Sequence, residues 1–230
     1  MRLARPVHPL AAATAAAVFL LAGCGGGGGG SKDDKIDGAG GSADKSASPS
    51  KSDAPAEGDA ADFRTSDIEL PDDVKLVFDW KQPSDEEKAA ALDGAADYLR
   101  VVRRGMVKDD PDDPVLAEHT VPLQTAAEYA THMRKQHAEK NYTVTGSERL
   151  YKEQVGEPVD GKLVEVAFCS DQSEIFSKEI KTGKVIRNSA TDDKNFVRFS
   201  VVMQKSSSGG ESWKARSVEV TEKAVKQCGK

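Results

Sequence analysis

The sequence is poor in the residues from which most metal and cofactor sites are built. Its 230 residues include only three cysteines and four histidines, and these lack the short spacings that zinc sites require. There is also no Gly-x-Ser-x-Gly elbow and no glycine loop of the phosphate-binding kind. We therefore expect no cofactor and no metal, and the sequence does not identify a reaction.

A long hydrophobic run is missing as well. The apolar and small-residue segment from Leu10 to Ala22 is too short for a membrane-spanning helix, which needs roughly 20 residues. It follows Arg2 and Arg5, and a short apolar run behind basic residues is typical of a secretory signal peptide.

The end of this run indicates a lipid anchor. Residues 21–24 read Leu-Ala-Gly-Cys, which resembles the lipobox of bacterial lipoproteins. The resemblance implies cleavage after residue 23, a diacylglyceryl group and a fatty acid such as palmitate on Cys24, and a place on the outer face of the cytoplasmic membrane. The alternative is an ordinary signal peptide in which Cys24 is incidental.

Apolar residues are nearly absent from residues 24–63, which consist mainly of Gly, Ser, Ala, Asp and Lys. Such a segment buries too little surface to offset the entropy of ordering it. We predict three parts: a signal peptide at 1–23, a lipidated cysteine with a disordered tether at 24–63, and one extracytoplasmic domain at 64–230.

The cysteine count is consistent with this division. An odd number would leave one unpaired thiol in an exported protein, but lipid on Cys24 leaves Cys169 and Cys228 as a pair. Thiols outside the cytoplasm usually oxidise. We expect a Cys169–Cys228 disulfide, and two buried free thiols or a metal site are the alternatives.

Excess positive charge is also lacking. The formal net charge is −6, and charges of both signs are interspersed along the domain. This pattern argues against nucleic acid as a partner and against a basic surface for anionic lipids. The expected membrane contact is therefore the lipid on Cys24.

Two helices come first in the domain. Apolar residues recur at helical spacing within 83–106 and 125–141. Each segment begins with the residues of a capping box, Ser84 with Glu87 and Thr125 with Glu128. Residues 64–80 are expected to form an extended segment laid on the fold.

The remainder alternates between apolar and polar residues as strands do. The expected strands are 142–155, 161–170, 173–180, 195–205 and 211–222, and one of the turns between them is Ser-Asp-Gln at 170–172. Helices followed by a meander of strands predict an α+β fold, with the helices packed on one face of an antiparallel sheet.

This order of elements resembles the nuclear-transport-factor-2-like (SnoaL-like) cone fold. The segments VAFCSDQSEIF…KTGKVIRN and SWKARSVEV…C are also similar to secreted lipoproteins of actinobacteria. In those proteins a Cys-x-Asp strand end pairs with a C-terminal cysteine. The resemblance covers about residues 70–228 and implies a curved sheet and a Cys169–Cys228 disulfide. It implies no particular reaction, because the fold serves enzymes, binders and assembly modules alike.

Asp171 is the acid that we single out as a candidate catalytic residue. The resemblance implies that an acid at a strand end could act as a general base with a partner across the pocket, for which we consider Tyr98, Tyr129 and His137. The alternative is an aspartate that hydrogen-bonds locally in the expected turn, where this residue type is common.

Other candidate groups have a plain structural interpretation. His132 and His137 are five residues apart, which does not place them on one helical face, and a metal would need a third ligand. The segment KDDPDDP at 108–114 has oxygen ligands that calcium accepts, but it lacks the spacing of an EF-hand loop. We interpret it as a solvated loop. Two tryptophans are expected in the core or at its rim, and four phenylalanines could fill the cone: Trp80, Trp213, Phe168, Phe176, Phe196 and Phe199.

For function we favour a lipid-anchored, non-enzymatic domain that binds a partner protein or another component of the cell envelope. One alternative is a carrier that holds a small ligand in the pocket of the cone. Another is an isomerase, cyclase or hydrolase of the SnoaL-like kind. A homodimer formed through the open face of the sheet would also suit this fold.

Overall fold

The computed structural model describes Phe63 and residues 65–187, 193–207 and 212–229. The predicted signal peptide, Cys24 and residues 24–62 of the predicted tether lie outside these residues. Phe63 is 2% exposed and packs against Phe78 and Trp80, so the packed part of the chain includes the last residue assigned to the tether. In the described part, no helix has both the length and the apolar character needed to cross a membrane.

The predicted helical segments form α1 (Glu86–Lys108) and α3 (Thr125–Glu139), with the short α2 (Val115–His119) between them. The expected capping boxes are wrong in detail. Asp85, rather than Ser84, caps α1 by accepting a hydrogen bond from the Lys88 N–H. Thr125 is the first residue of α3, and its hydroxyl instead accepts a hydrogen bond from the Val218 N–H.

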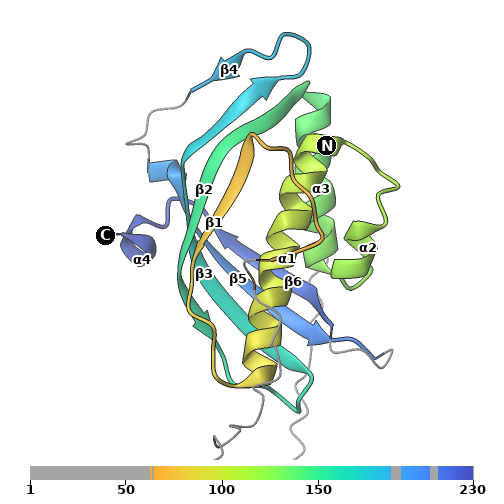
Figure 1. Cartoon of the computed structure of the whole chain (residues 1–230), viewed down its shortest axis with the longest axis vertical. Helices are drawn as coiled ribbons and strands as arrows, with labels where there is room; N and C mark the ends of the chain where they lie inside the picture. The colour runs from red at the N-terminus through yellow and green to blue at the C-terminus, as the bar shows by residue number, and fades with distance from the viewer. Residues whose placement is uncertain (1–62, 64, 188–192, 208–211, 230) are drawn as a thin grey trace, which may run out of the picture. The chain divides into compact units, whose positions relative to one another are not determined.

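The described strands form one curved sheet in the order β1-β2-β3-β5-β6, and β4 pairs with β3. Their bounds are β1 Val74–Asp79, β2 Tyr142–Val155, β3 Leu163–Glu179, β4 Val185–Ile186, β5 Phe196–Lys205 and β6 Trp213–Thr221. The short helix α4 (Val225–Cys228) ends the described chain. Figure 1 shows α1, α2 and α3 on one side of the sheet and α4 on the other. The predicted α+β fold with helices on a curved sheet is confirmed.

The sheet is mixed, and this corrects the expected antiparallel arrangement. Part of the extended segment 64–80 becomes β1, which pairs parallel with β2, from Val74 opposite Gly146 to Asp79 opposite Tyr151. A parallel pair needs a long crossover between its strands. The three helices supply that crossover, because they lie between β1 and β2 in the chain.

The expected turn at 170–172 does not exist, and β3 runs through it without interruption. The polar residues there belong to a bulge. The register shifts at Glu148, where residues 172 and 173 of β3 lie opposite this single residue of β2. A bulge leaves one residue of its strand unpaired, and here the Ser173 N–H donates to the Asp171 carboxylate at 3.0 Å.

The two faces of the sheet differ in what covers them. The face toward the helices, called the inner face below, carries Val144, Leu150 and Phe168, which belong to the main core with α1. The opposite face, called the outer face, carries Tyr151 and Cys169, which pack with Cys228 of α4.

Aromatic side chains fill the interior between helices and sheet. Phe168 and Phe199 are stacked with ring centroids 5.3 Å apart, and Trp80 lies 5.1 Å from Phe168. Phe168 and Phe199 are at most 1% exposed. Phe176 and Phe196 are only partly buried and do not belong to this cluster.

Candidate functional site

A buried ion pair occupies the inner face next to the aromatic core. Glu148 of β2 and Arg103 of α1 are 0% and 3% exposed at their side chains. The guanidinium donates twice, from Nε to Oε2 at 2.6 Å and from Nη2 to Oε1 at 2.7 Å. Ser170 and Gln172 of β3 donate to the same carboxylate at 2.6 and 3.3 Å. The pair therefore joins the longest helix to two strands.

These contacts keep Glu148 charged. Burial alone acts to raise the pKa of a carboxyl group, but the adjacent Arg103 and the hydrogen bonds from Arg103, Ser170 and Gln172 outweigh it and hold the pKa of Glu148 below its usual range. A general base needs a pKa near the working pH and access to substrate. Glu148 has neither, so its geometry is that of a structural ion pair.

Two residues of α3 lie near this pair. Burial raises the pKa of Tyr129, and Arg103 opposes that shift. Burial and the Arg103 charge together lower the pKa of His137. The Nδ1 atom of His137 is buried without a hydrogen-bond partner. Burial and the Arg103 charge thus both favour the neutral form of the His137 imidazole.

Sequence reasoning missed Glu148, although the signal is present in β2. Val144, Gly146, Glu148 and Leu150 alternate on one face of the strand, and Val144 and Leu150 are core residues. A glutamate at an inward position needs a buried cation. Arg103, on the apolar side of α1, supplies it.

Asp171 lies on the outer face, on the far side of the sheet from Arg103 and Glu148. It lies opposite Arg149 in the register of β2 and β3 and follows Cys169 by two residues, so its side chain is on the same face as the disulfide. Its carboxylate accepts the bulge N–H of Ser173. The local role that we considered for Asp171 is therefore present, although in a β-bulge instead of a turn, and Tyr98, Tyr129 and His137 are not brought to it.

Tyr98 has a structural contact of its own. It is fully buried in α1, and its hydroxyl donates to the Ala126 carbonyl at 3.0 Å. Burial raises the pKa of this hydroxyl far above its usual range. The contact ties α1 to the start of α3.

Two further histidines, His119 and His132, lie on different helices. His119 ends α2 and His132 is exposed on α3. Within the described residues, no group of three His, Cys, Asp or Glu side chains could hold a metal ion. Trp80 and Trp213 are 7% and 4% exposed and belong to the core.

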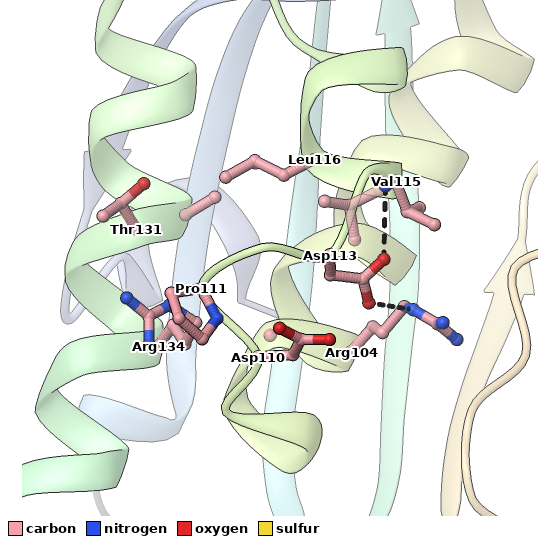
Figure 2. Close-up of a pocket in the computed structure, with 11 residues that line it drawn as sticks. Arg104, Asp110, Pro111, Asp113, Val115, Leu116, Thr131 and Arg134 are labelled. Carbon is pink, nitrogen blue, oxygen red and sulfur yellow. Dashed lines mark hydrogen bonds and ion pairs between the residues drawn. The ribbon is translucent and has the colours of Figure 1, made fainter.

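The acidic segment 108–114 forms one wall of a pocket between α1, α2 and α3 (Figure 2). Asp113 accepts from Arg104 Nε at 2.7 Å and from the Val115 N–H at 3.2 Å. Arg104 opposes the effect of burial on Asp113 and holds the pKa of that carboxyl below its usual value. On the other side, Arg134 of α3 donates to Asp109 at 2.8 Å. Two ion pairs thus fix the segment to the helices.

A second hollow lies on the outer face, across β1, β2, β3 and β4. It has a volume of about 560 Å³ and includes Lys75, Glu174, Phe176 and Arg187. The Arg187 guanidinium lies 4.5 Å from the centre of the Phe176 ring. Exposed apolar side chains of the adjoining hairpin are Ile180, Val185 and Ile186.

The predicted disulfide between Cys169 and Cys228 is present, with a Cα–Cα distance of 5.5 Å. Both cysteines are fully buried, and the Tyr151 hydroxyl donates to the Cys228 carbonyl at 2.8 Å. These contacts attach α4 to the outer face.

No protein-family model and no curated protein matches the chain. Among solved structures, it is similar to a ketosteroid isomerase-like protein from Erwinia carotovora atroseptica, with 16% identity, a TM-score of 0.39, and coverage of 60% of this chain and 97% of that one. It is also similar to a proposed ketosteroid isomerase from Shewanella frigidimarina, with 15% identity, a TM-score of 0.33, and coverage of 59% and 97%. A third similar structure is the intermembrane space region of the chloroplast protein ARC6, with 13% identity, a TM-score of 0.39, and coverage of 61% and 99%. Likeness at this level does not indicate the activity of this chain.

Proposed function

We propose that this protein is a lipid-anchored, extracytoplasmic domain that acts by binding a partner protein of the cell envelope. In this proposal Cys24 carries the lipid, residues 24–62 form the tether, and the domain presents its surface to the partner. The Leu-Ala-Gly-Cys sequence at residues 21–24 is the support for the anchor.

The observation that favours binding over catalysis is an interior occupied by aromatic rings, in which Arg103 neutralises the charge of Glu148. Phe168, Phe199 and Trp80 occupy the space between helices and sheet. Glu148, the acid on the inner face of β2, is fully buried and bonded twice by Arg103. An isomerase-like reaction needs an acid or base that can reach its substrate, and Glu148 does not meet this need.

The surface supports the same proposal. The pocket at 108–114 and the hollow beside Phe176 both combine apolar side chains with charged ones. Apolar groups exposed next to polar ones are common at protein interfaces. The exposed Ile180 and Ile186 lie next to the second hollow on the hairpin that forms its edge.

Mild chemical cross-linking of the full chain in its own membrane, followed by purification and mass spectrometry, tests the proposal. We expect lysines of the domain to be linked to another protein, and a diacylglycerol mass on the peptide that begins at Cys24. The Cys24→Ser variant should appear in the soluble fraction and lose the cross-links. A chain recovered unlinked to any other protein, or one with an unmodified Cys24, would overturn the proposal.

A further inference from the structure

The pocket between α1, α2 and α3 is small, with mostly apolar walls and a rim that carries two aspartates and two arginines. Its apolar lining comes from Val101 and Gly105 of α1, Val115 and Leu116 of α2, and Ala130 of α3. In Figure 2, Pro111 and Arg134 lie on one side of it and Asp113 with Arg104 on the other, and Asp110 lies between them.

The size of the pocket limits what can enter. Its volume of about 60 Å³ is far below the roughly 300–1,000 Å³ of sites for small organic ligands. On the same measure a single water needs about 10–15 Å³. The pocket therefore has room for about four to six water-sized groups, which is the size of one slender side chain.

The charge around the pocket determines which terminal group of that side chain would bind. Arg104 is paired with Asp113, and Arg134 is paired with Asp109. Asp110 and Asp112 are exposed, and none of the ion pairs among the described residues uses them. The four aspartates of the segment face three cations, Lys108, Arg104 and Arg134, which leaves a net charge of −1 around the pocket, so the rim favours a cation.

The walls of the pocket are held in place before any partner arrives. Arg104 donates to the Glu69 carbonyl at 3.0 Å as well as to Asp113, and the Asp112 N–H donates to Asp110 at 3.0 Å. A fixed pocket loses less conformational entropy on binding than one that must form.

We propose that this pocket receives a lysine side chain of a partner protein, with its methylene stem against Val101 and Leu116 and its ammonium group at Asp110. Lysine combines an apolar four-carbon stem with a compact cation, which matches the lining and the rim. The inference rests on the proposed function in taking the source of the lysine to be a protein.

One substitution alters the apolar lining of the pocket, and another alters the charge at its rim. Gly105→Ala adds a methyl group to the lining, where the new Cβ would lie 3.5 Å from Arg134 Cβ in ordinary contact. Alanine also favours the helix more than glycine does, so α1 should fold. Asp110→Asn removes the charge and keeps an oxygen for the Asp112 N–H. Glu219→Gln, at an exposed position of β6, is the matched control for loss of one charge.

The probe is the peptide acetyl-Gly-Gly-Lys-Gly-Gly-amide, titrated into the isotope-labelled full chain while the amide signals of Leu116 and Thr131 are followed by NMR. Two matched peptides replace lysine by diaminopropionic acid, which keeps the charge on a one-carbon stem, or by norleucine, which keeps the stem without the charge.

We expect saturable shifts with the lysine peptide and a weaker Kd for both matched peptides. Gly105→Ala should weaken the Kd about tenfold, because it takes space from the buried stem. Asp110→Asn should weaken it about two- to fivefold, and Glu219→Gln should not change it. Equal binding of the lysine and diaminopropionic acid peptides, equal binding of the lysine and norleucine peptides, or no effect of Gly105→Ala would overturn the proposal.

The membrane cross-linking experiment, repeated with Gly105→Ala, separates this inference from the proposed function. Loss of the cross-links to the partner supports the pocket as the contact. Unchanged cross-links overturn the pocket and leave the proposed function standing. If the unaltered chain gives no cross-link to another protein, the proposed function fails, whatever the peptide titration shows.

Discussion

Two neighbouring residues of β2 form ion pairs on opposite faces of the sheet. Glu148 points to the inner face and pairs with Arg103 at 2.6 Å, and both side chains are at most 3% exposed. Arg149 points to the outer face and pairs with Asp79 at 2.5 Å, with side chains 51% and 61% exposed. The contact distances are almost equal, and the surroundings differ completely.

The difference teaches that burial, and not the contact distance, decides how much stability is lost when an ion pair is broken. A buried charge that loses its partner keeps its full desolvation cost, whereas an exposed charge is solvated by water. The inner pair therefore fixes α1 against β2 and β3, and the outer pair is free to exchange with solvent or with a partner. The predictions below test this contrast.

The largest effect is expected from Arg103→Met, which leaves Glu148 buried without a cation. The free energy of unfolding should fall by about 3–5 kcal/mol, measured by urea denaturation. The double variant Arg103→Met with Glu148→Leu should recover part of that loss. An apolar pair of similar volume needs no solvation, but Ser170 and Gln172 lose the acceptor that Glu148 gave them. A double variant as unstable as the single one would show that the charges are needed for more than mutual neutralisation.

Removal of the disulfide should rank second. The Cys169→Ala/Cys228→Ala variant opens a cross-link between residues 59 positions apart. Because disulfides typically contribute about 2–4 kcal/mol, the free energy of unfolding should fall by about that amount. The same denaturation experiment measures it. A loss below about 0.5 kcal/mol would mean that Tyr151 and the other contacts hold α4 without the cross-link.

A smaller effect should follow pH through His137. Because its pKa in the folded chain is lowered from 6.5, the unfolded chain takes up a proton first as the pH falls. Stability is thus full above about pH 6.5 and decreases as the pH falls toward the lowered value. Thermal unfolding at pH 5 and pH 7 measures the slope.

His137→Gln should flatten this slope, and His132→Gln, at an exposed position of the same helix, should leave it unchanged. Equal slopes in the unaltered chain and in His137→Gln would contradict the assignment. Glu148, whose pKa is lowered from 4.5, should add a further loss only at more acidic pH.

The smallest effect belongs to the outer pair. Arg149→Met should change the free energy of unfolding by at most about 1 kcal/mol, and the change should shrink at high salt because exposed pairs are screened. A loss as large as that of Arg103→Met would remove the contrast between the two faces.

The sequence predicted the elements whose patterns are local. The helical spacing of apolar residues identified α1 and α3, because one face of each packs on the sheet. The parity of the cysteines pointed to Cys169 and Cys228, and their disulfide is present in the structure.

The errors concern features that depend on distant parts of the chain. The parallel pairing of β1 requires β2, which follows three helices later. The polar residues Ser170 and Asp171 suggested a turn, but each serves a different face of one strand, in contact with Glu148 or with the bulge. Glu148 was missed because its partner Arg103 lies 45 positions away.

Native mass spectrometry of the full chain, purified from its own membrane in mild detergent, tests most directly whether the interior is closed. A filled interior predicts that no small molecule is bound to the monomer. The same spectrum reads out the lipid that we propose on Cys24 and the two hydrogens lost in the Cys169–Cys228 disulfide. A reproducible adduct of one small molecule per chain, lost in the Arg103→Met/Glu148→Leu variant, would contradict it and would place a ligand beside the buried pair.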